Sequence, residues 1–324
     1  MDDMRKIRVN ENGQEWSWIS LQVNNWDELE VRQLYNDYPF TKEWLDMLPT
    51  VESNYLSVRF PGGREPIIFG SLLYSVEEEI KDGTRDCILM HFFVGKDVLI
   101  TINLDSHTCR VMGEKDHAAM LLACPRPVDG MFVLARTILH YFHNGMDRFE
   151  RNLRRVEEIM KKRNRKHLMD QILNSRFELL YWSNLFIPFL ELETAAREAY
   201  LEQMDDSVPF QRFKYRAERM SGLVKHYEKE IDTLISIDDA ISGFRGNDIM
   251  KTLTIMTAIF TPATVIGAIW GMNFDFLPWV KEGFFGFMLI SGLTLFTTIG
   301  FYVWIKAKGW TGDLLEVEEE NSNL

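Results

Sequence analysis

The sequence predicts an α+β domain followed by long helices and a C-terminal hairpin of two transmembrane helices. Three observations predict this fold class. The first is a pair of runs without a charged side chain, residues 252–274 and 283–305, each 23 residues long. The second is a series of short β-rich runs in the N-terminal third of the chain. The third is a helical pattern that continues with few breaks from about Glu114 to the first uncharged run.

The N-terminal part, residues 1–128, is predicted to be a cytoplasmic α/β domain with a largely antiparallel sheet. The stretches between its strands are too short for the crossover helices that a parallel sheet needs. Two helices are expected before the third strand, one capped by Asn25 and reaching about Tyr35, the other capped by Thr41 and reaching Met47. The predicted strands are 6–9, 16–21, 55–60, 67–74, 87–94 and 98–102.

Residues 129–208 are predicted to form a cytoplasmic hairpin of two long helices. Pro125 and Pro127 interrupt the chain before the hairpin, and Asp129 is expected to cap a helix that runs to about residue 163. A second helix is expected over about 166–204. The sequence Asp-Asp-Ser-Val-Pro at 205–209 then separates it from a third helix.

The third helix is predicted to start near Phe210, to form a stalk over 209–249 and to continue into the first membrane helix, 250–273. Such a helix would be about 90 Å long at 1.5 Å per residue. The alternative is two helices broken near Gly246. An unbroken helix would act as a lever that carries movements of the cytoplasmic domain into the membrane.

Both uncharged runs are long enough to cross a bilayer as helices. A short extracellular loop, 274–282, joins them, and an acidic cytoplasmic tail, 306–324, follows the second helix, 283–305. The positive-inside rule places both termini in the cytoplasm, because basic residues flank the hairpin on its outer sides. We therefore expect a multi-pass protein of the cell (inner) membrane. The flanking basic residues are Arg245, Lys251, Lys306 and Lys308.

One face of the first membrane helix carries side chains that suit a water-filled pore. They recur every three or four positions, which places them in one stripe. A single threonine in a membrane helix usually returns its hydroxyl to the backbone or packs against a neighbour. Three threonines in line indicate a pore wall, and since two helices cannot enclose a pore, several chains must assemble. The stripe consists of Asn247, Met250, Leu253, Thr257, Thr261, Thr264 and Ala268.

The stripe ends at the tripeptide Gly271-Met272-Asn273. A Gly-Met-Asn triplet that closes the first of two C-terminal membrane helices, with Pro262 and Thr264 upstream and a short loop downstream, resembles the CorA family of magnesium channels. The resemblance is strongest over about residues 247–278. It implies a homopentameric funnel whose pore the stripe lines.

The resemblance and the chemistry of Mg²⁺ together predict a selectivity filter at this triplet. Mg²⁺ is small, binds oxygen and loses water reluctantly. Neutral oxygens can hold the hydrated ion by accepting hydrogen bonds from its water shell, and a ring of Asn273 carbonyls supplies such acceptors. Gly271 allows a tight turn there, and Met272 is expected to pack outside the ring.

A gate is predicted deeper in the pore, where the resembling family has one. Leu253 and Met250 would form narrow apolar rings that close a pore by dewetting, with ordinary helix packing as the alternative. Asn247 is the next residue of the stripe towards the cytosol.

The sequence departs from the family pattern near the pore mouth. Trp270 stands where a tyrosine is usual, and Trp279 stands where the loop often carries an acid. The tail also lacks the usual lysine cluster. Asp275 and Glu282 remain as candidates for attracting cations to the mouth.

The predicted function is a divalent-cation channel that carries Mg²⁺ inward, with Co²⁺ or Ni²⁺ as further ions, and that is gated through the cytoplasmic domain. The alternatives are a metal exporter of the zinc type on the same architecture and a non-conducting, membrane-anchored ion sensor. The expected partners are further copies of the chain, the lipid bilayer and divalent cations. We expect no cofactor, with Mg²⁺ as both the transported and the regulatory ion.

The regulatory Mg²⁺ site stays unassigned. The resemblance implies acidic side chains between adjacent cytoplasmic domains, but the early stalk, residues 209–216, is basic. Solvated faces explain the other acidic clusters more simply, and a structural role explains His140 and His143. The acidic clusters are Glu77, Glu78, Glu79 and Asp82, and Asp238 and Asp239.

Composition and motifs argue against an enzyme and against nucleic-acid binding. The chain has a net charge of −12, and Glu150, Glu157 and Glu158 lie at neighbouring turns of its most basic run, 151–166, which indicates a salt-bridged helical face. It contains no phosphate-binding glycine loop, zincin helix or nucleophile elbow.

Overall fold

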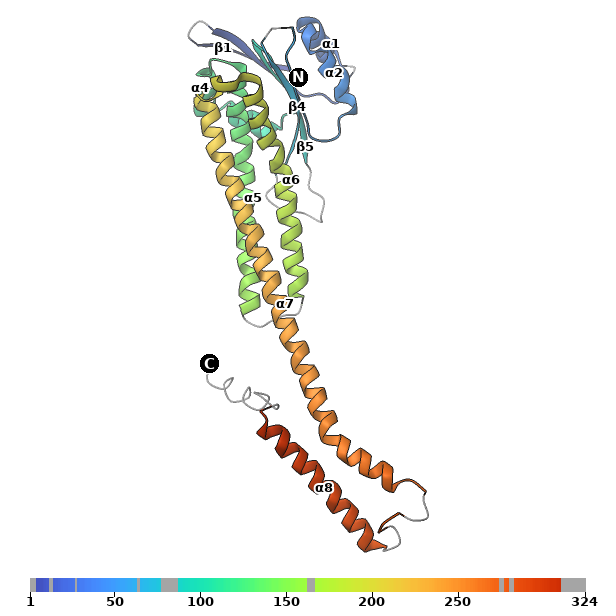
Figure 1. The fold of residues 1–324 in the computed structure, drawn as a ribbon. Helices are drawn as coiled ribbons and strands as arrows, with labels where there is room; N and C mark the ends of the chain where they lie inside the picture. The colour runs from blue at the N-terminus through green and yellow to red at the C-terminus, as the bar shows by residue number, and fades with distance from the viewer. Residues whose placement is uncertain are drawn as a thin grey trace. The chain divides into compact units, whose positions relative to one another are not determined.

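The computed structural model describes residues 4–11, 14–26, 28–62, 65–76, 87–161, 167–273, 277–279 and 283–309 (Figure 1). Two compact units divide it at residues 235 and 236, within one helix. The first unit contains a six-stranded sheet in the order β1-β2-β6-β5-β4-β3. Its strands are β1 Met4–Glu11, β2 Gln14–Leu21, β3 Tyr55–Arg59, β4 Ile67–Tyr74, β5 Ile88–Val94 and β6 Val98–Ile102.

The structure confirms the predicted strands to within two residues at each end and confirms a largely antiparallel sheet. The exception is the pair of β2 and β6, which run parallel. These two strands are far apart in sequence, so the chain between them is long enough to make the crossover that parallel pairing requires.

Helices lie on both faces of the sheet (Figure 1), and a hydrophobic core fills the space on each side. Alternation along β5 shows why: Met90 and Phe92 pack into the core under the long helices, while Phe93 packs into the smaller core under α1 and α2. Side chains of a strand point alternately to opposite faces, and both faces here are apolar. Helix α1 is Leu29–Asp37 and helix α2 is Lys42–Met47.

The predicted caps of these short helices were only partly right. Asn25 does not cap α1; the N-cap position is Glu28, whose carboxylate accepts a hydrogen bond from the Asn25 backbone N–H at 2.9 Å. Thr41 does stand at the N-cap position of α2, but its hydroxyl donates back to the Tyr38 carbonyl. Helix α3, Ser106–Met112, was not predicted from the sequence; Asp105 caps it by accepting a hydrogen bond from the Thr108 N–H.

Long helices make up most of the rest of the chain. Helix α4 is Lys115–Leu122, α5 is Pro127–Lys161, α6 is Leu168–Tyr200, α7 is Val208–Trp270 and α8 is Phe284–Ala307. Helix α7 runs for 63 residues without a break at Gly246, so the continuous helix is confirmed and the broken alternative is wrong. Asp129 was wrongly predicted as the cap of α5, because the helix already begins at Pro127, a residue suited to a first turn.

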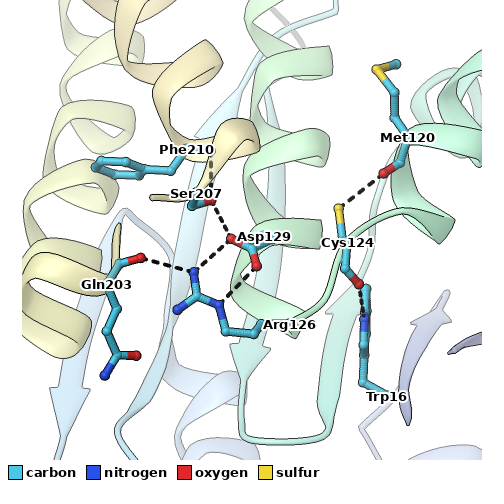
Figure 2. Close-up of polar contacts among 8 residues, drawn as sticks. All are labelled: Trp16, Met120, Cys124, Arg126, Asp129, Gln203, Ser207 and Phe210. Carbon is cyan, nitrogen blue, oxygen red and sulfur yellow. Dashed lines mark hydrogen bonds and ion pairs between the residues drawn. The ribbon is translucent and has the colours of Figure 1, made fainter. Parts of the chain in front are cut away.

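Asp129 instead ties the start of α7 to the start of α5 (Figure 2). Its carboxylate accepts a hydrogen bond from the Ser207 hydroxyl and two from the Arg126 guanidinium, at 3.0 and 3.2 Å. The Ser207 hydroxyl in turn accepts from the Phe210 backbone N–H at 3.2 Å, which is an N-cap bond of α7. The origin of the longest helix is therefore held by a buried polar network.

The packing of α5 on α6 depends on a glycine. A Cβ built on Gly145 would lie 2.1 Å from the Cη2 atom of Trp182, which is a core residue. We expect Gly145→Ala to lower the free energy of unfolding by about 2–3 kcal/mol, because the overpacked indole must move. Thermal unfolding in detergent would measure this loss.

Gly222, within α7, is the matched control. A Cβ built there meets nothing within 4 Å. Gly222→Ala should therefore raise stability by roughly 0.5–1 kcal/mol through helix propensity. Equal effects of the two substitutions would contradict the packing argument.

His91 should make the first unit sensitive to acid. It is only 3% exposed, its Nδ1 lies 2.6 Å from the Ser71 hydroxyl, and burial lowers its pKa to about 4. In the unfolded state the His91 imidazole is therefore protonated below about pH 6.5, whereas in the folded state it stays neutral down to about pH 4. As the pH is lowered from about 6.5 to about 4, the free energy of unfolding should fall by at most ~1.4 kcal/mol per pH unit. Unfolding of wild type and His91→Asn at pH 7, 6 and 5 measures the difference, and parallel pH profiles would contradict it.

Candidate functional site

The stripe of α7 is open to its surroundings in the single chain. Leu253 is 56% exposed and Met250 62% exposed, although both are large apolar residues. All seven residues of the stripe, from Asn247 to Ala268, are exposed. Nothing within the described part of the chain covers this face of the helix.

The half-buried residues of the same helix segment lie on the other side. With about 100° of rotation per residue around the helix axis, the middle of this half-buried face lies roughly half a turn from the middle of the stripe. A cavity of about 650 Å³ lies between their face and α8, bordered by Ile266 and Trp270 of α7 and by Ile290 and Thr294 of α8. Near the C-terminal end of α7, helix α8 thus lies on the side that is opposite to the stripe. The half-buried residues include Lys251, Ile255, Ile259, Pro262 and Ile266.

The three threonines of the stripe use their hydroxyl hydrogens within the helix. Thr257, Thr261 and Thr264 donate to the carbonyls four residues earlier, at 2.8, 2.7 and 3.0 Å. Each hydroxyl oxygen keeps lone pairs that can accept hydrogen bonds. These three threonines therefore present acceptors and not donors to the exposed face, which suits a cation that arrives with its water shell.

The Gly-Met-Asn triplet lies at the C-terminal end of α7. The Gly271 N–H donates to the Gly267 carbonyl at 2.9 Å, and the Met272 N–H to the Ile269 carbonyl at 3.3 Å. A Cβ built on Gly271 would lie 2.8 Å from the Gly267 oxygen, so the close turn needs a glycine. Asn273 follows this turn, is exposed, and makes no side-chain hydrogen bond to another described residue. Its amide is available to a ligand.

Two indole rings lie beside this triplet, a contact that the sequence analysis did not predict. Trp270 and Trp279 stack with their ring centroids 6.3 Å apart and their planes 3° from parallel. Both residues depart from the family pattern, and only the fold shows that their rings stack. Asp275 and Glu282, the predicted cation-attracting residues, lie outside the described residues.

The structure assigns no regulatory metal site. Within the described part of the chain, no group of three or more His, Cys, Asp or Glu side chains is placed to hold a metal ion. Burial lowers the pKa of Arg136 on α5, and the positive charge of Arg212 in the early stalk lowers it further, so two basic side chains lie near each other there. Glu77, Glu78, Glu79 and Asp82 fall outside the described residues.

Both apolar helices suit a membrane and not a protein core. The most apolar window is 0% buried in α7 and 6% buried in α8. A core helix of a soluble protein would be mostly buried, so these surfaces need another apolar environment.

Comparison with known proteins agrees with this architecture. The family model described as "CorA-like Mg2+ transporter protein" matches residues 13–307. The chain is 29% identical over 308 residues to the magnesium transport protein CorA of Bacillus subtilis (strain 168), covering 94% of each chain.

Solved structures share the fold at low identity. The complete structure of the CorA magnesium transporter from Methanocaldococcus jannaschii matches with a TM-score of 0.68 and 18% identity, over 93% of each chain. The cytoplasmic domain of ZntB from Vibrio parahaemolyticus RIMD 2210633 matches with a TM-score of 0.54 and 12% identity, over 76% of this chain and 100% of that domain. Because the family model spans most of the sequence, this chain is a membrane protein of the CorA-like Mg²⁺ transporter family.

Proposed function

We propose that this protein is a channel that carries Mg²⁺ into the cell, with Co²⁺ or Ni²⁺ as further ions. One observation carries the proposal: the polar stripe of α7 is exposed on the face opposite to α8. In an assembly with α7 innermost, the stripes of several copies would face one another across a shared axis. The magnesium transporters among the relatives support the choice of ion.

The chemistry of the stripe supports passage of the hydrated ion. Water bound to Mg²⁺ donates hydrogen bonds outward, and Mg²⁺ gives up that water reluctantly. Thr257, Thr261 and Thr264 offer acceptor oxygens, since their hydrogens are already donated to the backbone. Asn273 offers an amide oxygen at the outer end. An ion can move from one acceptor ring to the next without losing its shell.

The apolar part of the stripe supports a gate near the cytoplasmic side. Leu253 and Met250 are exposed in the single chain, so in an assembly their side chains would meet across the axis. Apolar rings that approach closely expel water and stop ions. Helix α7 starts in the first unit and continues through this gate, which gives the cytoplasmic domain a mechanical route to it.

We also propose how the protein assembles and how it is oriented in the membrane. The assembly is a homopentamer in the cell (inner) membrane, and both termini lie in the cytoplasm, as the flanking basic residues favour. Mg²⁺ also acts as the regulatory ion.

Reconstitution tests the proposal. Purified protein in liposomes that hold a Mg²⁺-sensitive dye and little internal Mg²⁺ should give dye-reported influx under an inside-negative potential, and protein-free liposomes should not. Absence of influx would favour the non-conducting sensor. Transport of Zn²⁺ without Mg²⁺ would favour the exporter of the zinc type, for which the ZntB likeness at 12% identity shows the fold alone.

A further inference from the structure

The end of α7 and the connecting segment after it are joined by a pair of tryptophans. Trp270 is the last residue of α7, and its ring lies nearly parallel to that of Trp279, with the centroids 6.3 Å apart. The Trp270 Nε1–H also donates a hydrogen bond to the Pro278 carbonyl at 3.2 Å. One side chain thus holds two consecutive residues of the segment that leads to α8.

The backbone at Trp279 is in a costly conformation. Its φ is +66°, in the left-handed region that a bulky side chain rarely adopts. Such a conformation persists only where surrounding contacts hold it, and these conformations gather at functional sites. Among the described residues, the stack on Trp270 and the hydrogen bond to Pro278 are contacts that can hold it.

The two residues of the Trp270–Trp279 pair lie on either side of the Gly-Met-Asn triplet in the sequence. Gly271, Met272 and Asn273 follow Trp270 directly, and the chain returns to the same point at Pro278 and Trp279. The triplet therefore lies in a loop whose two ends are fixed to each other. Fixing the ends of a loop reduces the conformations open to the residues within it, and a ligand-binding group gains affinity when it is pre-organised.

We infer that Trp270 and Trp279 form a positioning clasp that holds Asn273 in the geometry that recognises the hydrated cation. The clasp rests on the proposed function, because it acts through the Asn273 amide. It touches no ion itself. It also accounts for both departures from the family pattern with one contact: the aromatic residue at 279 stands in place of an acid because it stacks on the aromatic residue at 270.

A simpler role for a tryptophan near a membrane surface is anchoring at the lipid interface. Trp304, near the C-terminal end of α8, is the comparison residue for this role. Its ring packs on Phe301 within its own helix, with the centroids 5.5 Å apart, and it is 46% exposed. Trp304→Ala therefore removes an anchoring ring without touching the triplet.

The test measures the Mg²⁺ concentration at half-maximal influx in liposomes, together with the maximal rate. Trp279→Ala should raise that concentration about three- to tenfold, as expected for the loss of one aromatic pair. Trp279→Phe, which keeps a stacking ring, should restore it to within about twofold of wild type. Trp270→Phe keeps the ring but loses the hydrogen bond to Pro278, so its value should lie between those of wild type and Trp279→Ala. Trp304→Ala should match wild type.

The outcomes separate the clasp from the channel. No influx by wild type would overturn the proposed function itself. The clasp alone would be overturned by a second outcome. In it, Asn273→Ala abolishes influx, but Trp279→Ala and Trp270→Phe leave the half-maximal Mg²⁺ concentration unchanged. An equal rise in Trp304→Ala would also overturn it, in favour of general anchoring. If Trp279→Ala does not assemble, the result for Trp270→Phe decides.

Discussion

Asn273→Ala is expected to reduce Mg²⁺ influx by about a hundredfold or more at low Mg²⁺. A hydrogen bond to a charged partner contributes about 1.5–3 kcal/mol, and the water shell of one ion can contact several amides of a ring at once. Losing two such bonds already corresponds to about a hundredfold in binding. The exposed amide of Asn273 has no other described partner, so its loss should cost the fold little. The measurement is dye-reported influx in liposomes.

Asn273→Ser is the matched variant for this prediction, because it shortens the side chain but keeps an oxygen acceptor. Its influx should lie between that of wild type and Asn273→Ala. Size-exclusion chromatography and cross-linking should show the same assembly for all three proteins. Wild-type influx by Asn273→Ala, with the assembly intact, would remove the filter from the proposed mechanism.

Asp129→Ala is expected to lower the free energy of unfolding by about 3–5 kcal/mol, the cost of removing one partner from a buried ion pair. Asp129 is 1% exposed, and the side chain of Arg126 is 26% exposed. Without the carboxylate, the guanidinium loses its two strong hydrogen bonds and the Ser207 hydroxyl loses its acceptor (Figure 2). The start of α7 should loosen first, because Ser207 caps that helix.

Chemical unfolding in detergent measures this loss, and two variants bound it. Asp129→Asn keeps an acceptor for Ser207 but no charge for Arg126, so its stability should be intermediate. Asp147→Ala, on the same helix, removes an exposed carboxylate 3.8 Å from His143 and should cost no more than about 1 kcal/mol. A loss in Asp129→Ala no larger than that in Asp147→Ala would show that the network does not hold α7.

Much of the fold followed from local patterns. Strands β4 and β6 could be placed because each is a short run between turns, β4 rich in aliphatic and aromatic residues and β6 rich in β-branched ones. The 63-residue helix α7 could be predicted because its sequence holds no strong breaker before the membrane apart from Gly243 and Gly246, and the helix also continues past Pro262. Predicting the stripe required only the 3.6-residue helical repeat, and all of its residues are exposed on one side of α7 in the structure.

Two cap assignments failed, for different reasons. Asp129 follows two prolines and so resembles a cap of its own helix, yet its hydroxyl partner is Ser207, 78 residues later. Asn25 precedes a helix at the right distance, but Glu28 takes the N-cap position. A side chain can satisfy several backbone positions with similar energy, so packing chooses among them.

The sequence by itself determined the strands, the unbroken helix α7, the two apolar helices and the residues of the candidate pore, since these depend on β-rich runs, hydrophobic length and helical period. Tertiary structure decided which face of α7 lies against α8, which acid holds the start of α7, and that Trp270 meets Trp279. The physical reason is range: periodicity acts between neighbours along the chain, whereas a stack or a buried ion pair forms between residues that only the folded backbone brings together.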